Sequence, residues 1–250
     1  MTSVNDIFNF ICGLAPLDLQ LDFDNSGLLF GRKDAAVSKA LLSLDITPAV
    51  IEEAAGLGAE LIISHHPLIF SALKAVTDNK LLMLAENRIA VISMHTNLDI
   101  AAGGVNDVLM SVLGAESAGS LDSFGCGRIG SLPQTMTMPA FLSLCKQRLN
   151  AGGLRYYDSG KPVKKLAVMG GSGGDSIEDA IRLGCDTYLT ADIKYHQFLQ
   201  AAELRINLID GGHFCTENPV IPVLAAQLSA RFDEPEFIVS SRHDRIIRFA

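Results

Sequence analysis

The sequence predicts an α/β fold made of two related α/β repeats with mainly mixed sheets and a metal crevice between the two lobes. Three observations predict it. Short apolar runs typical of buried strands alternate with helical patterns, two segments half a chain apart repeat without a gap, and three apolar runs end in His, two of them with an acidic residue beyond. Strand ends of an open α/β sheet lie at the crevice where ligands bind, so we expect these polar residues to meet there.

The first half contains three predicted strands with helices between them. Each strand is a short apolar run, and each helix follows from a longer pattern of apolar and polar residues. In order, the predicted elements are a strand at 40–44, a helix at 49–58, a strand at 61–64, a helix at 81–87 and a strand that starts near Val91.

The second half repeats this order: strand 165–169, a Gly-rich turn, helix 176–184, strand 187–190, helix 197–204 and a strand that starts near 208. The segments that start at Ile51 and Ile177 align without a gap, at an offset of 126 residues. The third strand of each half leads into H-x-x-x-[D/E], which makes His95 and His213 equivalent. A chance likeness between unrelated β-α-β units is the alternative to a duplication.

The best boundary between the halves lies at 111–131, which is rich in Gly and Ser. We therefore predict one two-lobed domain over 1–250, with lobes 1–125 and 126–250. Smaller predicted elements are a helix at 140–149 with Pro139 in its first turn, a turn at 156–162, and a hairpin or edge strand formed by 237–240 and 246–249.

Composition and charge exclude several classes of protein. The 250 residues include 28 acidic and 20 basic side chains, for a net charge of −8. This balance disfavours extensive contact with nucleic acid and favours a small-molecule or nucleotide substrate. No apolar run approaches the roughly 20 residues that span a bilayer, and Met1–Phe10 lacks signal-peptide features, so we expect a cytoplasmic protein with no membrane contact. The five scattered cysteines are expected to be reduced, and mostly core residues.

Five residues form the predicted metal site: His65, His66, Asp99, His213 and Glu217. Imidazole and carboxylate ligands suit divalent Zn, Fe, Mn, Ni or Co, and two carboxylates can bridge two ions. We therefore expect two divalent transition-metal ions per chain. Pro67 forces an extended turn after His65 and His66, which lets both rings face the crevice. The alternative is one buried structural His and one surface His.

Proton transfer and substrate contact are assigned to other residues near these strand ends. His95 and His196 are the candidates for proton transfer, because an imidazole titrates near physiological pH. His95 is also a candidate for orienting a ligand. The candidates for substrate contact are Asn97, Asp192, Lys194 and Tyr195. The alternative for the residues near position 192 is a solvated helix start.

Two further features have plainer interpretations. Gly170–Gly174 lies between a strand and a helix, where backbone N–H groups can hold an anion, but it lacks a complete dinucleotide or P-loop motif. A tight turn is therefore favoured. Cys215 lies between His213 and Glu217, and we expect it to be a small filler because its direction differs from theirs.

Several segments carry a family resemblance: S-H-H-P-L-I-F (64–70), H-T-N-L-D (95–99), T-A-D-I-K-Y-H (190–196) and G-H-F-C-T-E (212–217). D-F-D-N-S-G-L-L-F-G (22–31) is similar to a W-D-N-x-G-L motif, with Phe23 in place of Trp. The chain therefore resembles, over essentially its whole length, the GTP cyclohydrolase I type 2 homolog family, also called the Ngg-interacting-factor-three-like dinuclear metal-binding proteins. Ala191, where Gly is common, is the other departure.

The resemblance implies two α/β repeats, a two-metal centre held by the five residues above, and a homohexamer built from dimers. The short connection at about 114–132 indicates no inserted central domain. The family name implies GTP cyclohydrolase activity, in which a hydroxide bridging the two ions opens the purine imidazole ring and formate leaves. The alternatives are metal-dependent hydrolysis of another nucleotide, phosphoester or cyclic amide, and a non-catalytic metal-binding chaperone or interaction scaffold.

Overall fold

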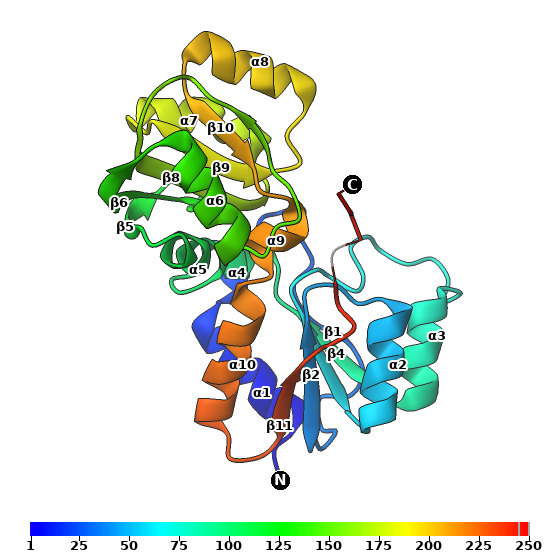
Figure 1. The fold of residues 1–250 in the computed structure, drawn as a ribbon. Helices are drawn as coiled ribbons and strands as arrows, with labels where there is room; N and C mark the ends of the chain where they lie inside the picture. Colours follow the sequence, from blue (N-terminus) through cyan, green and yellow to red (C-terminus); the bar gives the residue numbers. More distant parts are fainter. Residues whose placement is uncertain (245, 250) are drawn as a thin grey trace. The chain divides into compact units, whose positions relative to one another are not determined.

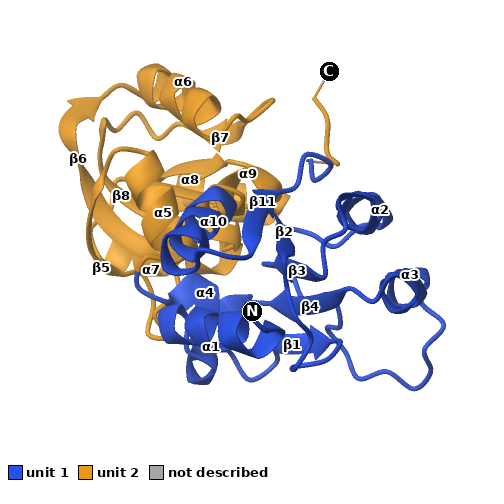
Figure 2. Ribbon diagram, turned by 90° about the horizontal axis from the view of Figure 1, so that it is seen from below, with its two compact units in different colours: residues 1–102, 221–244 blue, residues 103–220, 245–250 orange. Residues whose placement is uncertain are grey.

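A computed structural model describes residues 1–244 and 246–249. The chain divides into two compact units (Figure 2). Unit 1 comprises Met1–Ala102 and Ile221–Asp244, and unit 2 comprises Gly103–Val220 with the end of the chain. Each unit contains one mixed sheet with helices, which confirms the predicted α/β class.

Unit 1 contains a five-stranded sheet of order β1-β4-β3-β2-β11 (Figure 1). β2, β3, β4 and β11 are parallel, and β1 is antiparallel to β4 at the edge. Its elements are α1 (Val4–Leu14), η1 (Leu17–Leu19), β1 (Gly27–Phe30), β2 (Lys39–Ser43), α2 (Pro48–Leu57), β3 (Leu61–Ser64), α3 (Asn79–Asn87), β4 (Ala90–Ser93), α4 (Thr96–Ile100), α10 (Val220–Arg231, which starts at the boundary) and β11 (Glu236–Val239).

Unit 2 contains a six-stranded sheet of order β5-β6-β8-β9-β10-β7. β8, β9 and β10 are parallel, and the other three strands are antiparallel to their neighbours. Its elements are α5 (Val105–Val112), β5 (Glu116–Ser120), β6 (Arg128–Met136), α6 (Met138–Arg148), β7 (Arg155–Tyr157), β8 (Val163–Ser172), η2 (Gly174–Ser176), α7 (Ile177–Arg182), β9 (Thr187–Ala191), α8 (Tyr195–Leu204), β10 (Asn207–Asp210) and α9 (His213–Glu217).

The two sheets repeat one arrangement of four strands. β1-β4-β3-β2 in unit 1 corresponds to β7-β10-β9-β8 in unit 2, with an antiparallel edge strand in both. Even the register repeats: Ala40 pairs with Leu61, and Leu166 pairs with Thr187, each position shifted by the 126 residues that the sequence alignment gave. The units differ at the next position, where β11 runs parallel to β2 but β6 runs antiparallel to β8.

Local sequence signals explain where the main helices begin and end. Thr47 and Thr137 cap α2 and α6 with their side-chain oxygens, and each is followed by a proline in the first turn. α2 ends at Gly58, which has φ of 70° and adopts the left-handed conformation that a glycine permits without strain. The predicted helices at 49–58 and 140–149 are thus confirmed, with ends that differ by one or two residues.

The apolar faces of the elements form the cores of each unit. In unit 1, β2, β3 and β4 pack against α2 and α3 through fully buried residues such as Leu41, Ile62 and Val91. In unit 2 one face of the sheet packs on α5 and α6, and the other on α7 and α8. Cys145, Cys185 and Cys215 are buried in these cores as thiols outside any disulfide, as the sequence predicted for most of its cysteines.

The compact units do not follow the predicted lobes 1–125 and 126–250. Unit 2 already begins at Gly103, because α5 packs on β5, β6 and β8. Residues 221–244 return to unit 1, because β11 pairs with β2. The Gly- and Ser-rich stretch at 111–131 is therefore no linker, since it forms β5 and the start of β6.

Two smaller predictions need correction. The segment 156–162 was expected to be a turn, but Tyr156 and Tyr157 belong to β7, because this edge strand pairs with β10. Residues 237–240 do form most of an edge strand, β11, but 246–249 add no strand to it, so the predicted hairpin is absent from the described residues. Arg245, in the turn predicted between these two segments, lies outside the described residues.

No helix in the described part of the chain combines the length and the apolar character needed to cross a membrane.

Replacing Ile62 with Ala should destabilise unit 1. Ile62 is fully buried in the middle of β3, and removing buried carbon atoms from such a position costs about 2–5 kcal/mol. We expect urea unfolding, followed by circular dichroism, to show a lower midpoint. Leu57→Ala, at the exposed end of α2, is the control and should shift the midpoint much less. Equal shifts would contradict the burial pattern.

Candidate metal centre

Two adjacent histidines, His65 and His66, directly follow strand β3. Its four residues are all buried, and its pairing with the β2 side continues beyond the strand, where the His66 N–H donates to the Leu44 carbonyl at 2.9 Å. Pro67 has no N–H and cannot extend this ladder. The rings of His65 and His66 have centroids 5.0 Å apart, so the two imidazoles are direct neighbours.

An oxygen atom contacts the Nδ1 atom of each ring. His65 is fully buried with Nδ1 2.9 Å from the Met94 carbonyl, and His66 has Nδ1 2.7 Å from Asp45 Oδ1. Carbonyl and carboxylate oxygens only accept hydrogen bonds, so Nδ1 carries the proton of the neutral ring. The lone pair then lies on Nε2, which is the arrangement found in metal-ligating histidines.

His95 joins this pair from the start of α4. Its ring centroid lies 5.2 Å from that of His65 and 5.7 Å from that of His66. Its Nδ1 is 2.8 Å from Asp24 Oδ1, so the same argument places its lone pair on Nε2. One ring nitrogen from each of the three histidines lies within 4.8 Å of the others, which suits a shared metal site.

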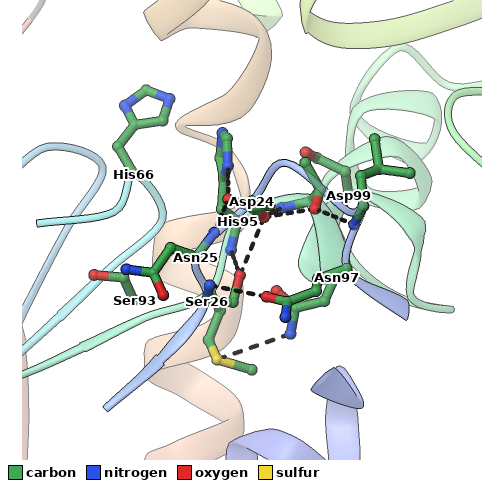
Figure 3. Close-up of polar contacts among 12 residues, drawn as sticks. Asp24, Asn25, Ser26, His66, Ser93, His95, Asn97 and Asp99 are labelled. Carbon is green, nitrogen blue, oxygen red and sulfur yellow. Dashed lines mark hydrogen bonds and ion pairs between the residues drawn. The ribbon is translucent and has the colours of Figure 1, made fainter. Parts of the chain in front are cut away.

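Asp24 is the carboxylate that fixes His95 (Figure 3). Its other oxygen accepts hydrogen bonds from the Thr96 N–H at 2.9 Å and the Thr96 hydroxyl at 2.5 Å. Burial favours the neutral carboxyl, but the hydrogen bonds from His95 and Thr96 outweigh it and hold the pKa of Asp24 well below its ordinary range. A charged acceptor therefore sets the orientation of His95.

Asp99 brings a second carboxylate to the cluster. It lies on α4, and its Oδ1 is 3.7 Å from His65 Nε2. The H-x-x-x-D spacing, which the sequence left open between a helix and a loop, is helical here. Asn97, on the same helix, is fully buried and donates Nδ2 to the Ala15 carbonyl at 2.8 Å. It fixes α4 near the end of α1, which does not support the predicted substrate contact.

Unit 2 holds the other predicted ligands on α9. His213 and Glu217 lie one helical turn apart, on the same face, with Nε2 and Oε2 3.1 Å apart. The His213 Nδ1 atom is 2.7 Å from Asp192 Oδ2, so this ring also has an oxygen acceptor at Nδ1. Burial lowers the pKa of His213, but Glu217 and Asp192 outweigh it and raise the pKa to about 9. The two carboxylates, Asp192 and Glu217, therefore favour a positive charge at the His213 ring, either as imidazolium or as a bound metal ion.

Gly171 lies directly against the Glu217 carboxylate. Its φ is 65°, and a Cβ atom there would lie 2.1 Å from Glu217 Oε1 and 3.3 Å from His213 Nε2. Only glycine both adopts this conformation and leaves room for the carboxylate. The missing side chain of Gly171 therefore leaves the space that the Glu217 carboxylate occupies beside β8.

Three N–H groups of the Gly-rich segment 170–174 already donate to side chains and are not available to an anion. The N–H of Gly170 donates to Asn106, that of Gly171 to Thr216, and that of Gly173 to Thr190, all to side-chain oxygens at 2.8–3.0 Å. Side chains of unit 2 thus already use these donors. The predicted tight turn is wrong for most of this segment, because residues 170–172 extend strand β8 and Gly174 begins η2, with only Gly173 between them.

Asp192 supports His213 and is itself held by a network. It has φ of 53°, a left-handed conformation uncommon for a non-glycine residue. The next residue, Ile193, donates its N–H to Asp210 Oδ2, and Asp210 Oδ1 accepts from Gly212 N–H. Arg155 also pairs with Asp210. One carboxylate thus joins the loop before His213 to the loop that carries Asp192, so we assign Asp192 to positioning His213 instead of substrate contact.

The remaining candidates for substrate contact and proton transfer lie at the exposed start of α8, and the structure does not place them among the residues described above. Lys194 is the exposed N-cap residue of α8, and Tyr195 is 78% exposed in its first turn. His196 is exposed beside them and makes no hydrogen bond or ion pair with another residue that the structure describes. These positions fit the solvated helix start that the sequence offered as the alternative. Cys215 points into the core, as expected of a filler.

Sequence reasoning missed two residues that orient the histidines, Asp24 and Asp45. Both follow or precede strands by a few residues, but nothing in their spacing pairs them with histidines 71 and 21 positions away. The available signal for Asp24 was its place in the D-F-D-N-S-G segment. Gly171 was noted as part of a loop, but its contact with Glu217 depends on the folded chain.

Comparisons with known proteins agree with the fold. A family model described as Duf34/NIF3 (NGG1p interacting factor 3) matches residues 2–245. A "GTP cyclohydrolase 1 type 2 homolog" of Clostridium perfringens is 39% identical and covers 95% of both chains. One of Campylobacter jejuni is 37% identical over 90% of this chain and 91% of its own.

Solved structures show the same likeness. A Bacillus cereus protein related to NIF3 has a TM-score of 0.92 at 25% identity, covering 100% of this chain and 99% of its own. Reduced HcgD from Methanocaldococcus jannaschii has a TM-score of 0.85 at 32% identity, covering 96% of this chain and 98% of its own.

Gly171→Ala should weaken metal binding without unfolding the protein. The new methyl group would displace the Glu217 carboxylate, which it would meet at 2.1 Å. We expect at least a tenfold loss of affinity, about 1.4 kcal/mol, in a competition titration with a chromophoric chelator. Gly160→Ala is the matched control, because Gly160 has φ of 80° and nothing near its Cβ position. Equal metal affinity in the two variants would contradict the assigned role.

Asp24→Asn should destabilise unit 1 by about 1–3 kcal/mol, because it replaces a buried charged acceptor of five hydrogen bonds. The folded-state pKa of Asp24 is depressed, so its stabilising effect is complete above the ordinary pKa of about 4 and declines as pH falls below that value. Urea unfolding of both proteins from pH 7 to pH 3 should show the difference shrinking. Exposed Asp18→Asn is the control.

Proposed function

The chain belongs to the Duf34/NIF3 family, and on that premise we propose that it is a dinuclear metal-dependent hydrolase. One observation supports this most: the three histidines proposed as ligands, His65, His66 and His213, each have an oxygen acceptor at Nδ1. Metal-ligating histidines typically have such an acceptor, because it fixes both the orientation of the ring and the nitrogen that carries the lone pair.

We propose His65, His66, Asp99, His213 and Glu217 as the ligands, shared by two divalent ions. Their donor set of imidazole nitrogens and carboxylate oxygens fits Zn, Fe, Mn, Ni or Co. In each unit a carboxylate oxygen lies near a ring Nε2 atom, at 3.7 Å for Asp99 and His65 and 3.1 Å for Glu217 and His213. Two divalent metal ions held by these ligands would supply Lewis acidity and activate water near neutral pH.

His95 is proposed as the proton carrier. Asp24 holds its Nδ1 proton, so Nε2 is the atom that would take up and return a proton. Asp24 would then stabilise the imidazolium that forms, because it remains ionised. His95 is thus proposed to transfer protons, whereas His65 and His66 are proposed to bind metal, although the His95 ring lies beside theirs.

The finer proposal is ring-opening hydrolysis of GTP with release of formate. Its support is the name carried by relatives that are 32–39% identical, "GTP cyclohydrolase 1 type 2 homolog". We also propose, from the family resemblance, a cytoplasmic homohexamer, for which sedimentation velocity is the test.

Elemental analysis should find close to two transition-metal ions per chain in protein purified without chelator or nickel resin. His65→Ala, Asp99→Ala and Glu217→Ala should each lose one or both ions, because each removes a ligand. His196→Ala, an exposed imidazole at the start of α8, should retain them. Absence of metal after reconstitution of the wild-type protein would contradict the proposal.

Formate release then tests the substrate. The metal-loaded protein should release one formate per GTP consumed, and the ligand variants should release none. Hydrolysis of another nucleotide, phosphoester or cyclic amide without formate from GTP would retain the hydrolase and reject GTP as its substrate. If the protein binds metal but hydrolyses none of these substrates, the result would favour a metal-binding chaperone or scaffold over a hydrolase.

A further inference from the structure

Two exposed aromatic side chains, Phe23 and Phe70, lie next to the histidine cluster of unit 1. They are 61% and 52% exposed, and their ring centroids are 6.3 Å apart with a tilt of 46°. The Phe70 ring is in turn 6.4 Å from the His95 ring, nearly perpendicular to it at 79°. Leaving two large aromatic side chains in water forgoes the gain of burying them, so an exposed pair beside a polar cluster indicates a binding surface.

Hydrogen bonds from the neighbouring residues hold this pair in place. Asp24, directly after Phe23, is bonded to His95 and Thr96. Asn25 donates its side-chain Nδ2 to the carbonyl of Ile69, directly before Phe70, at 2.6 Å. The two segments are therefore joined to each other and to the start of α4, while the aromatic rings stay exposed. A surface fixed in advance in this way loses little entropy when a ligand binds.

We propose that Phe23 and Phe70 bind a planar heteroaromatic ring of the substrate by stacking, with the ring held beside His95. The proposal rests on the proposed function, in which His95 and its neighbours form the reaction centre. Aromatic faces accept any flat π system and leave the polar edge of the ring accessible. The substrate class is therefore a nucleobase-like heterocycle, in preference to an aliphatic chain or a phosphoester without a ring.

Calorimetric titration of guanosine into the metal-loaded full-length protein tests the stacking surface. Phe23→Ala and Phe70→Ala should each raise its Kd about fivefold or more, because removing one stacking partner of a base has an effect of that order. Phe23→Tyr keeps an aromatic face and should bind like the wild type. Ribose 5-phosphate, which lacks the ring, should bind no differently to the Ala variants and the wild type.

Phe124→Ala is the control for loss of an exposed aromatic side chain, because Phe124 is 70% exposed in unit 2. It should leave the guanosine Kd unchanged. Metal content and sedimentation of every variant are measured in parallel. Unchanged metal content separates loss of ring binding from loss of the metal centre, and guanosine titration of Glu217→Ala shows whether the surface works when the metal site does not.

Two results would overturn the proposal. One is a wild-type protein that binds no guanosine, or variants that bind it as the wild type does. The other is a change in oligomeric state in Phe23→Ala and Phe70→Ala with guanosine affinity preserved, which would make the pair a contact between copies of the chain. Guanosine binding that depends on both rings, in a protein that hydrolyses nothing, would uphold this surface and reject only the hydrolase.

Discussion

The contact between an oxygen acceptor and Nδ1 of each cluster histidine is the interaction on which the proposed centre depends. The acceptors differ: the Met94 carbonyl for His65, and carboxylates for the other three rings. Their effect on the neutral ring is the same, because each keeps the proton on Nδ1 and leaves the lone pair on Nε2. For His213, whose pKa is raised to about 9, the ring must first lose the proton that Glu217 and Asp192 favour. Without them the imidazoles would be free to rotate and to change tautomer. Burial of His65 and Asp24 adds to this, since a desolvated hydrogen bond is stronger than an exposed one.

The repeated strand arrangement explains where the histidines lie and where the two units differ. Ser93 ends β4, and Asp210 ends β10. One residue separates Ser93 from His95, whereas two glycines separate Asp210 from His213. His95 consequently lies just before the first residue of α4 and its ring contacts Asp24, while His213 is the first residue of α9 and contacts Glu217 one turn later. One inserted residue thus gives two equivalent histidines different partners.

Much of this could be predicted from sequence, because buried strands such as β3 and β9 are short apolar runs and their ends are marked by His, Pro or acidic residues. β5 could not, because all its residues are exposed and small or polar, so that it resembles a linker. The roles of Asp24 and Asp45 could not be predicted either, since they reach their histidines from the segments before β1 and after β2, far away in the sequence. The contact of Gly171, near the end of β8, with Glu217 on α9 depends on the folded chain, and no local pattern encodes it.

The central claim is that the five proposed ligands, His65, His66, Asp99, His213 and Glu217, bind two metal ions per chain. Anomalous diffraction from crystals of the metal-loaded protein, recorded on both sides of the absorption edge of the metal, tests it most directly. The account predicts two peaks per chain, with these five side chains around them. The absence of anomalous peaks, or peaks at other side chains, would contradict it.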